Sequence, residues 1–278
     1  MSAEKVTLTA EKETLLITLL AKAGESRLPD SLLHDEWAAR AVERIDYDFS
    51  KLKVDRNLMI GVSMRAHIFD GWTREFLRGH PQATVIHMGC GLDSRVFRVD
   101  PGPEVRWFDV DYPEVIALRE RLFPPRKGYT MIPTSVTAPG WIEALPADRP
   151  TLILAEGLMM YVGVEEAPRL IGRVLGRFNE VGGELAFDGF SKRGARMILR
   201  HQAVKATGAS MHWTIEDPHS LEREFSQLRL VTDYHAYDPR GYDPRQVARL
   251  SWAARVAVKL FALIPALGRI SRLLRYRF

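Results

Sequence analysis

Residues 84–99, with the sequence TVIHMGCGLDSRVFRV, constrain the fold of this chain more than any other stretch. An apolar run at 84–88 ends in Gly89-Cys90-Gly91. Two glycines there allow the backbone to turn sharply and to come close to a ligand. The pattern predicts the first strand and first loop of a Rossmann-like sheet. Cys90 has no evident charged partner, so we interpret it as a small loop filler and not as a nucleophile.

The next strand-like run, VRWFDVDYPEV, places Asp111 twenty residues after Gly91. A carboxylate at the end of a second strand can accept hydrogen bonds from the two hydroxyls of a ribose. A dinucleotide fingerprint needs a third glycine where the helix begins, but Ser94 stands there, and Asp93 adds negative charge near the amides that a pyrophosphate would need. These residues favour a nucleoside cofactor without phosphates, such as S-adenosylmethionine. A nicotinamide-dependent oxidoreductase stays as the alternative.

From residue 84 onward, strand-like and helix-like runs alternate, which is typical of a parallel sheet covered on both faces. In the final residues, apolar and basic side chains alternate, so that Leu274, Tyr276 and Phe278 lie on one side. This pattern predicts a seventh, antiparallel strand. The other expected strands are 84–88, 104–110, 129–133, 151–155, 184–189 and 229–236, and the expected helices are 94–98, 113–122, 139–145, 164–178, 192–206 and 218–226.

Before the first strand, the chain is expected to be helical. Amphipathic or helix-like patterns cover about 9–23, with Thr9 as a cap, then 30–45 and 57–78. We expect one domain over 1–278. Its parts are an N-terminal helical lid (1–80), a cofactor-binding half (81–190), and a region with the substrate lid, the sixth strand, C-terminal helices and the terminal strand (191–278).

Composition excludes several classes of protein. The chain is 46% hydrophobic and 27% charged, so it can form a sizeable core, and its single cysteine excludes an intramolecular disulfide framework. No secretory signal is visible, which predicts a cytoplasmic protein. A formal charge of +4 without a long basic run does not indicate nucleic-acid binding. Residues 251–278 hold six basic and no acidic residues, so membrane-surface contact is an alternative to the terminal strand.

Three blocks in order, GCGLDSRVFR, DVDYPEV and ILAEGLMMYV, resemble the leucine carboxyl methyltransferase family. The resemblance is closest to its bacterial branch of natural-product O-methyltransferases of the tetracenomycin type, and it runs from about Leu32 to the C-terminus. It implies a class I methyltransferase fold, with a mostly parallel seven-stranded sheet, and S-adenosylmethionine as cofactor. The family's activity on a protein C-terminal carboxyl group is a further alternative.

The resemblance also implies roles for individual residues. Arg65 in SMRAHIFD matches an arginine that binds the cofactor's carboxylate, and Glu156 matches a glutamate that lines the cofactor site. From the residues alone, Arg65 could equally be a solvated arginine and Glu156 a capping or salt-bridged acid. Ser135-Val136 replaces the family's Asp-Leu pair at the adenine. The expected cofactor-binding residues are Arg65, Gly89, Gly91, Asp111, Ser135, Val136 and Glu156.

The resemblance places the substrate lid between the fifth and sixth strands, so residues for the methyl acceptor are predicted there and just after Glu156. No metal-binding spacing, G-x-S-x-G motif or P-loop is present. We predict transfer to a carboxylate of a small molecule, or to a phenol, and the lack of a strong base favours the carboxylate. A non-catalytic cofactor-binding protein is the remaining alternative. The acceptor candidates are Tyr161, His201 and His212 for catalysis, and Tyr161, Lys205 and Trp213 for substrate binding.

Overall fold

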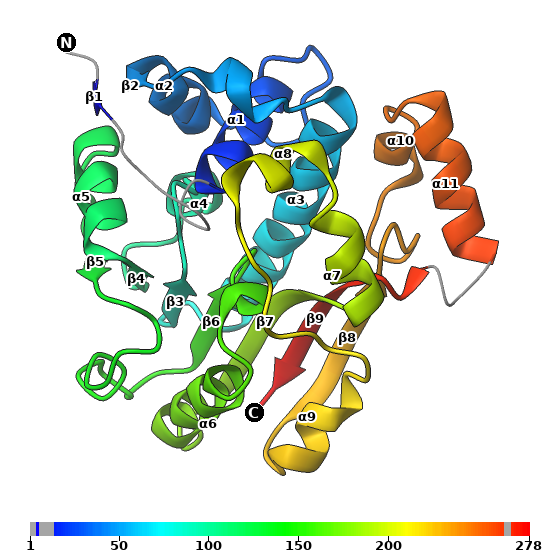
Figure 1. Cartoon of the computed structure of the whole chain (residues 1–278). Coiled ribbons are helices and arrows are strands. Elements are labelled where there is room, and N and C mark those ends of the chain that lie inside the picture. Colours follow the sequence, from blue (N-terminus) through cyan, green and yellow to red (C-terminus); the bar gives the residue numbers. More distant parts are fainter. Residues whose placement is uncertain (1–3, 6–13, 264–267) are drawn as a thin grey trace.

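The computed structural model describes residues 4–5, 14–263 and 268–278. Its centre is a seven-stranded sheet with helices on both faces (Figure 1). The strand order is β5-β4-β3-β6-β7-β9-β8, in which only the pairings of β9 are antiparallel. The predicted α/β fold, with a mostly parallel seven-stranded sheet, is confirmed. The strands are β3 (Thr84–Met88), β4 (Arg106–Asp111), β5 (Tyr129–Pro133), β6 (Thr151–Ala155), β7 (Gly183–Phe190), β8 (Arg229–His235) and β9 (Ser271–Arg277).

The central strands form because they are continuous apolar runs, which suits strands covered on both faces. Every residue of β3 and of β6 is buried. One face packs on α6 (Glu166–Phe178) and α9 (His219–Glu224), and the other face packs on the long helix α3 (Arg56–Gly79) and on α4 (Arg95–Val99). The sheet core therefore holds the carboxyl ends of its parallel strands in fixed positions.

The N-terminal helices gather beside the carboxyl ends of the strands (Figure 1). They share an apolar cluster with α5 and with Leu92 in the loop after β3. The expectation of a cap at Thr9 lies outside the described residues. These elements are α1 (Thr14–Ser26), α2 (Glu36–Arg44), the 3-10 turn η2 (Phe49–Leu52) and α5 (Pro113–Leu122), and a short parallel pair joins β1 (Glu4–Lys5) to β2 (Ile45–Asp46).

Three expected helices are wrong in extent or type. The segment 139–145 forms turns, because Gly140 adopts a left-handed φ of +87°. The segment 192–206 is two helices, α7 (Lys192–Ile198) and α8 (Gln202–Thr207), separated where His201 has an extended backbone. The helix expected from residue 30 begins only after Asp35, whose side chain accepts a hydrogen bond from the amide of Ala38.

The C-terminal strand β9 lies between β7 and β8, so it is an interior strand. Tyr276 is fully buried, stacks on Phe187 with ring centroids 5.9 Å apart, and donates a hydrogen bond to the Pro218 carbonyl at 2.8 Å. Arg275 is also buried, and its Nε is 2.6 Å from Glu184. At least one basic residue of the C-terminal segment, Arg275, therefore forms an ion pair inside the sheet.

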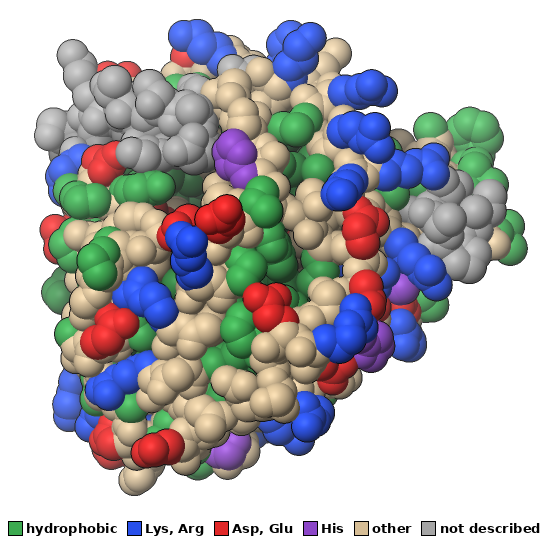
Figure 2. Space-filling view, turned by 60° about the horizontal axis from the view of Figure 1, so that its bottom comes forward, with side chains coloured by type: hydrophobic (Ala, Val, Ile, Leu, Met, Phe, Trp, Pro, Cys, Tyr) green, Lys and Arg blue, Asp and Glu red, His purple; other side chains and the backbone are tan. Residues whose placement is uncertain are grey.

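Two further helices precede this strand, α10 (Pro244–Val247) and α11 (Trp252–Leu263). Trp252 and Leu263 of α11 are largely exposed, and Figure 2 shows hydrophobic side chains protruding at the right-hand edge, where α11 lies. None of the described helices is both long and apolar enough to cross a bilayer. Contact with a membrane surface stays a prediction.

Deleting residues 273–278 should give an insoluble or unfolded protein. The deletion removes the strand that joins β8 to the rest of the sheet, and it uncovers the apolar side chains under Tyr276. The measurements are soluble yield and thermal unfolding. The control, Tyr276→Phe, keeps the ring and loses one hydrogen bond, so it should cost only about 1 kcal/mol. A truncated protein with normal unfolding would contradict the structural role of β9.

Candidate active site

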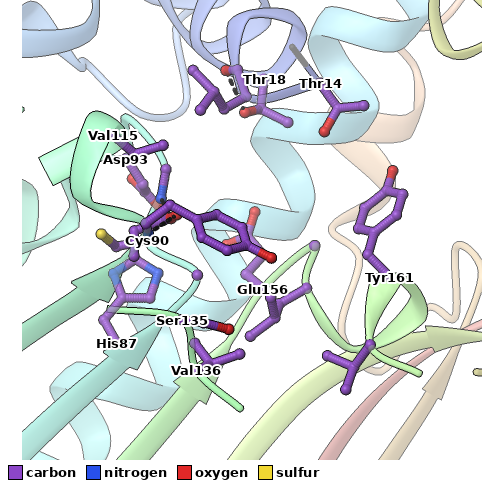
Figure 3. A pocket seen from close by; sticks show the side chains of 18 of the residues that line it. Thr14, Thr18, His87, Cys90, Asp93, Val115, Ser135, Val136, Glu156 and Tyr161 are labelled. Atoms are coloured by element: carbon purple, nitrogen blue, oxygen red, sulfur yellow. Dashed lines mark hydrogen bonds between the residues drawn. The ribbon is translucent and has the colours of Figure 1, made fainter. Parts of the chain in front are cut away.

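The carboxyl ends of four parallel strands meet at one edge of the sheet, where ligands of open α/β folds bind. A cavity of about 270 Å³ opens there. The side of the cavity opposite the strand ends is formed by α1, whose residues Thr14 and Thr18 face Ser135 and Val136 across it (Figure 3). All seven residues predicted to bind a cofactor line this cavity, namely Arg65, Gly89, Gly91, Asp111, Ser135, Val136 and Glu156.

The loop after β3 requires both of its glycines. Gly89 and Gly91 have φ values of +60° and +50°, which residues other than glycine rarely adopt. A Cβ atom at Gly89 would lie 2.7 Å from a methyl carbon of Leu158, and one at Gly91 would lie 3.3 Å from Cβ of Leu15. The glycines thus leave room at the cavity wall that any side chain would fill.

Asp111 is held in place by backbone amides at the end of β4. One carboxylate oxygen accepts a hydrogen bond from Gly91 at 2.7 Å, and the other accepts one from Tyr112 at 2.8 Å. Burial raises the pKa of Asp111 above its ordinary value, and these amides oppose that shift. Each carboxylate oxygen has a further lone pair, so the group can also accept hydrogen bonds from the cavity.

Arg65 reaches the cavity from α3 and contacts two acids. Its Nε is 3.0 Å from Oε1 of Glu156, and its Nη1 is 2.8 Å from Oδ2 of Asp188. The side chain is only 19% exposed, so the alternative of a solvated arginine is wrong. Because it is also a cavity-lining group, it can present charge to a bound anion.

Glu156 follows β6 and is the centre of a buried ion-pair network. It pairs with Arg65 and Arg95, and Nζ of Lys22 lies 3.7 Å from its Oε1. Burial by itself raises the pKa of Glu156, but Lys22, Arg95 and Arg65 outweigh burial and lower it to about 2. Glu156 is therefore salt-bridged and also lines the cavity. The two alternatives that the sequence left open, a salt-bridged acid and a residue of the cofactor site, are thus compatible.

Lys22 and Asp188 are among the charged residues of this network that the sequence did not single out. Lys22 extends from α1 to within 3.0 Å of Asp93, and Asp188 in β7 pairs with Arg65. A signal existed for both, because each charge lies within an apolar run, LLAKAG and LAFDGF, where an unpaired charge would be costly. The partner of each, however, could not be predicted from these local runs.

Of the predicted acceptor residues, only Tyr161 lines the cavity. Its ring points toward Thr14 on α1 (Figure 3). Trp213 is in the core and packs on Phe187 with ring centroids 5.8 Å apart. His212 is exposed, and its amide donates to the Met160 carbonyl. His212 and Trp213 are therefore not among the residues that line the cavity.

The remaining candidates also lie away from the cavity lining. Lys205 is exposed on α8, and His201 is the half-buried residue before that helix. Cys90 is buried, which raises the pKa of its thiol well above the ordinary value, as suits a loop filler. Among the described residues, no group of His, Cys, Asp or Glu is arranged to hold a metal ion.

Glu156→Gln should flatten the acid limb of the stability curve. The folded pKa of about 2 lies below the ordinary 4.5, so the stability from this group is complete above about pH 4.5 and is lost as the pH falls toward 2. Thermal unfolding between pH 2 and 6 measures the effect. Glu165→Gln, at an exposed pair with Arg169, should leave the curve unchanged. Equal acid limbs in wild type and Glu156→Gln would refute the ion-pair account.

Comparison with known proteins identifies relatives over nearly the whole chain. The family model of leucine carboxyl methyltransferase matches residues 15–175. The chain is 40% identical to the tetracenomycin polyketide synthesis O-methyltransferase TcmP of Streptomyces glaucescens, with 99% of each chain covered. It is 32% identical to the S-adenosyl-L-methionine-dependent methyltransferase dpfgK of Gibberella zeae, with 99% of this chain and 97% of the relative covered.

The fold agrees with that of solved methyltransferase structures. A candidate methyltransferase from Thermobifida fusca superposes with a TM-score of 0.58 at 17% identity, covering 94% of this chain and 93% of the other. No comparison supports the oxidoreductase alternative or a non-catalytic protein. The chain belongs to the leucine carboxyl methyltransferase family and is an S-adenosylmethionine-dependent O-methyltransferase.

Proposed function

We infer that the cavity beneath α1 is the S-adenosylmethionine site and that the seven predicted residues bind the cofactor there. The inference is supported by the position of Asp111, which can accept both ribose hydroxyls, and by the glycines that leave the loop wall open. The adenine would lie beside Ser135-Val136. Ser135 offers a neutral hydroxyl there, which is a weaker partner than the carboxylate of the family pattern.

The charged end of the cavity suits the amino acid part of the cofactor. Arg65 and Lys22 would attract its carboxylate, while Glu156 would accept from its ammonium group. When bound, the cofactor supplies a methyl group already activated by a sulfonium, so the protein has only to align the acceptor and exclude water. The N-terminal helices, with α1 over the strand ends, would act as the lid that excludes water.

The acceptor is proposed to be a carboxylate of a small molecule. Carboxylates are ionised at neutral pH and need no general base, whereas a phenol must lose a proton. Glu156 and Asp93, two acids of the cavity, are poor bases, because the pKa of Glu156 is about 2 and neighbouring cations hold that of Asp93 well below its ordinary value despite burial. Burial raises the pKa of Asp111, but both of its carboxylate oxygens accept hydrogen bonds from backbone amides. His87 also lines the cavity, but its ring is buried between Arg95 and Asp109. The choice of a carboxylate as acceptor rests on these contacts, which occupy Glu156, Asp93 and His87.

Hydroxyl groups of the cavity lining would orient the acceptor. Tyr161 and Thr14 line the cavity, and a hydroxyl group can donate a hydrogen bond to a carboxylate. Thr18 also lines the cavity, but its hydroxyl donates to the Leu15 carbonyl at 2.9 Å. The relative from Streptomyces glaucescens acts in polyketide synthesis, which supports a natural-product acid over a protein C-terminus as the acceptor. A cytoplasmic location and the division into lid, cofactor half and substrate lid belong to the same proposal.

Asp111→Ala should weaken binding of S-adenosylhomocysteine by about 1.5–3 kcal/mol, roughly ten- to a hundredfold in Kd, because ribose hydroxyls lose a charged acceptor. Calorimetric titration measures the change. The matched control is Asp148→Ala, which removes an exposed acid paired with Arg106 and should leave Kd unaltered. Unaltered affinity in a folded Asp111→Ala protein would show that the cofactor does not bind in this cavity.

The rate of methyl transfer to an aromatic carboxylic acid should be nearly flat from about pH 6 to 9 in single turnovers, since both reactants keep their charge. A panel of aromatic acids and matched phenols, assayed with labelled cofactor, identifies the acceptor class. Tyr161→Phe should raise KM for the acid without adding a pH limb. A rate that rises tenfold per pH unit, with phenols preferred, would refute the carboxylate assignment.

A further inference from the structure

Asp188 is a buried acid next to the cavity that the roles above do not use. It lies in β7, is 1% exposed, and is not among the residues that line the cavity. One carboxylate oxygen accepts a hydrogen bond from the amide of Gly157 at 2.5 Å, and the other accepts from Nη1 of Arg65 at 2.8 Å. A single side chain therefore joins α3 to the turn that carries Glu156.

These contacts restrict the guanidinium of Arg65. Glu156 accepts a hydrogen bond from Nε, and Asp188 accepts one from Nη1. Nη2 is the nitrogen of the guanidinium that neither acid contacts in these two bonds. Nη2 is also the atom that a Cβ on Gly157 would meet, at 3.5 Å, so it lies beside the glycine turn of the cavity wall. Because a guanidinium is planar and rigid, holding two of its nitrogens sets the direction of the third.

We propose that Asp188 is a positioning residue, which holds Arg65 so that Nη2 faces the carboxylate of the bound cofactor. The proposal rests on the assignment of the cavity as the cofactor site. A preorganised arginine does not lose side-chain freedom again when the anion binds, so its bond contributes more to affinity. Without Asp188, Arg65 keeps one anchor, Glu156, about which it can rotate.

The dependence is mutual. Burial raises the pKa of Asp188, and Arg65 together with the Gly157 amide opposes the rise. The charge of Asp188 is thus stabilised by the group it positions, and the loss of either partner leaves a buried charge with fewer contacts. The effect of Asp188 on the cofactor should pass entirely through Arg65 and should concern only the amino acid part of the ligand.

The test compares two ligands in calorimetric titrations of wild type and Asp188→Asn. S-Adenosylhomocysteine carries the amino acid part, and 5′-methylthioadenosine lacks it. The substitution nearly preserves shape and keeps an acceptor for Gly157. We expect Kd for S-adenosylhomocysteine to rise by about tenfold or more, and Kd for 5′-methylthioadenosine to change by less than about twofold. Asp188→Ser serves as the second variant if the asparagine protein is insoluble.

Two further proteins separate positioning from general loss of stability. Glu184 lies in β7, as Asp188 does, and its ion pair with Arg275 of β9 is comparably buried. Glu184→Gln weakens that pair, so it should lower the unfolding temperature without changing either Kd. Adding Asp188→Asn to Arg65→Ala should cause no further loss of affinity, because the two residues act as one unit. Equal losses for both ligands, or additive losses in the double variant, would overturn the proposal.

The outcome also separates this inference from the cavity assignment. If Asp111→Ala weakens both ligands while Asp188→Asn weakens neither, the cavity assignment stands and the positioning role of Asp188 falls. If Asp111→Ala and Arg65→Ala leave both affinities unaltered, the cavity is not the cofactor site, and the inference about Asp188 falls with it.

Discussion

The buried ion-pair network beneath the cavity is the interaction on which the site depends. Lys22 of α1 pairs with Asp93, and Arg65 of α3 pairs with Glu156 and Asp188. The network therefore connects two helices of the N-terminal region to the strand ends. Removing one partner of such a buried pair typically costs about 3–5 kcal/mol, because the other charge is left without compensation. The groups that we propose to bind the cofactor also stabilise the fold, so substitutions at the site have to be judged by ligand affinity and unfolding together.

The same network explains what chemistry the site favours. Cations close to Glu156 and Asp93 keep these acids ionised far below neutral pH, which suits them to bind positive charge and makes them poor proton acceptors. Methyl transfer from a sulfonium to a carboxylate needs no proton transfer. A cavity with fixed charges and hydroxyl groups in its lining is therefore adequate for the proposed reaction.

The strand order of the sheet fixes the position of β7, which carries Asp188 of this network. Antiparallel β9, between β7 and β8, covers the edge of β7 along its whole length, from Glu184 to Phe190. Asp188 lies in the middle of that pairing, opposite Leu273. The last residues of the chain thus support, through β7, an acid that contacts Arg65 from α3.

The sequence by itself determined the local features. Apolar runs predicted the strands closely, since a buried parallel strand has to be apolar along its length. The glycine loop and the spacing of Asp111 predicted the cofactor edge, because the carboxyl ends of parallel strands share one side of a sheet. The resemblance to the family predicted roles for Glu156, in the block ILAEGLMMYV, and for Arg65, in SMRAHIFD. All of these signals lie within single segments of the chain.

Only the tertiary structure decided which distant groups meet. Arg65 and Asp188 are separated by 123 residues, and no local pattern connects them. The segment after β7 breaks at His201 and turns Trp213 into the core, so neither residue is among those that line the cavity. Long-range pairing depends on how helices pack against the sheet, and the side-chain pattern of one segment does not contain that geometry.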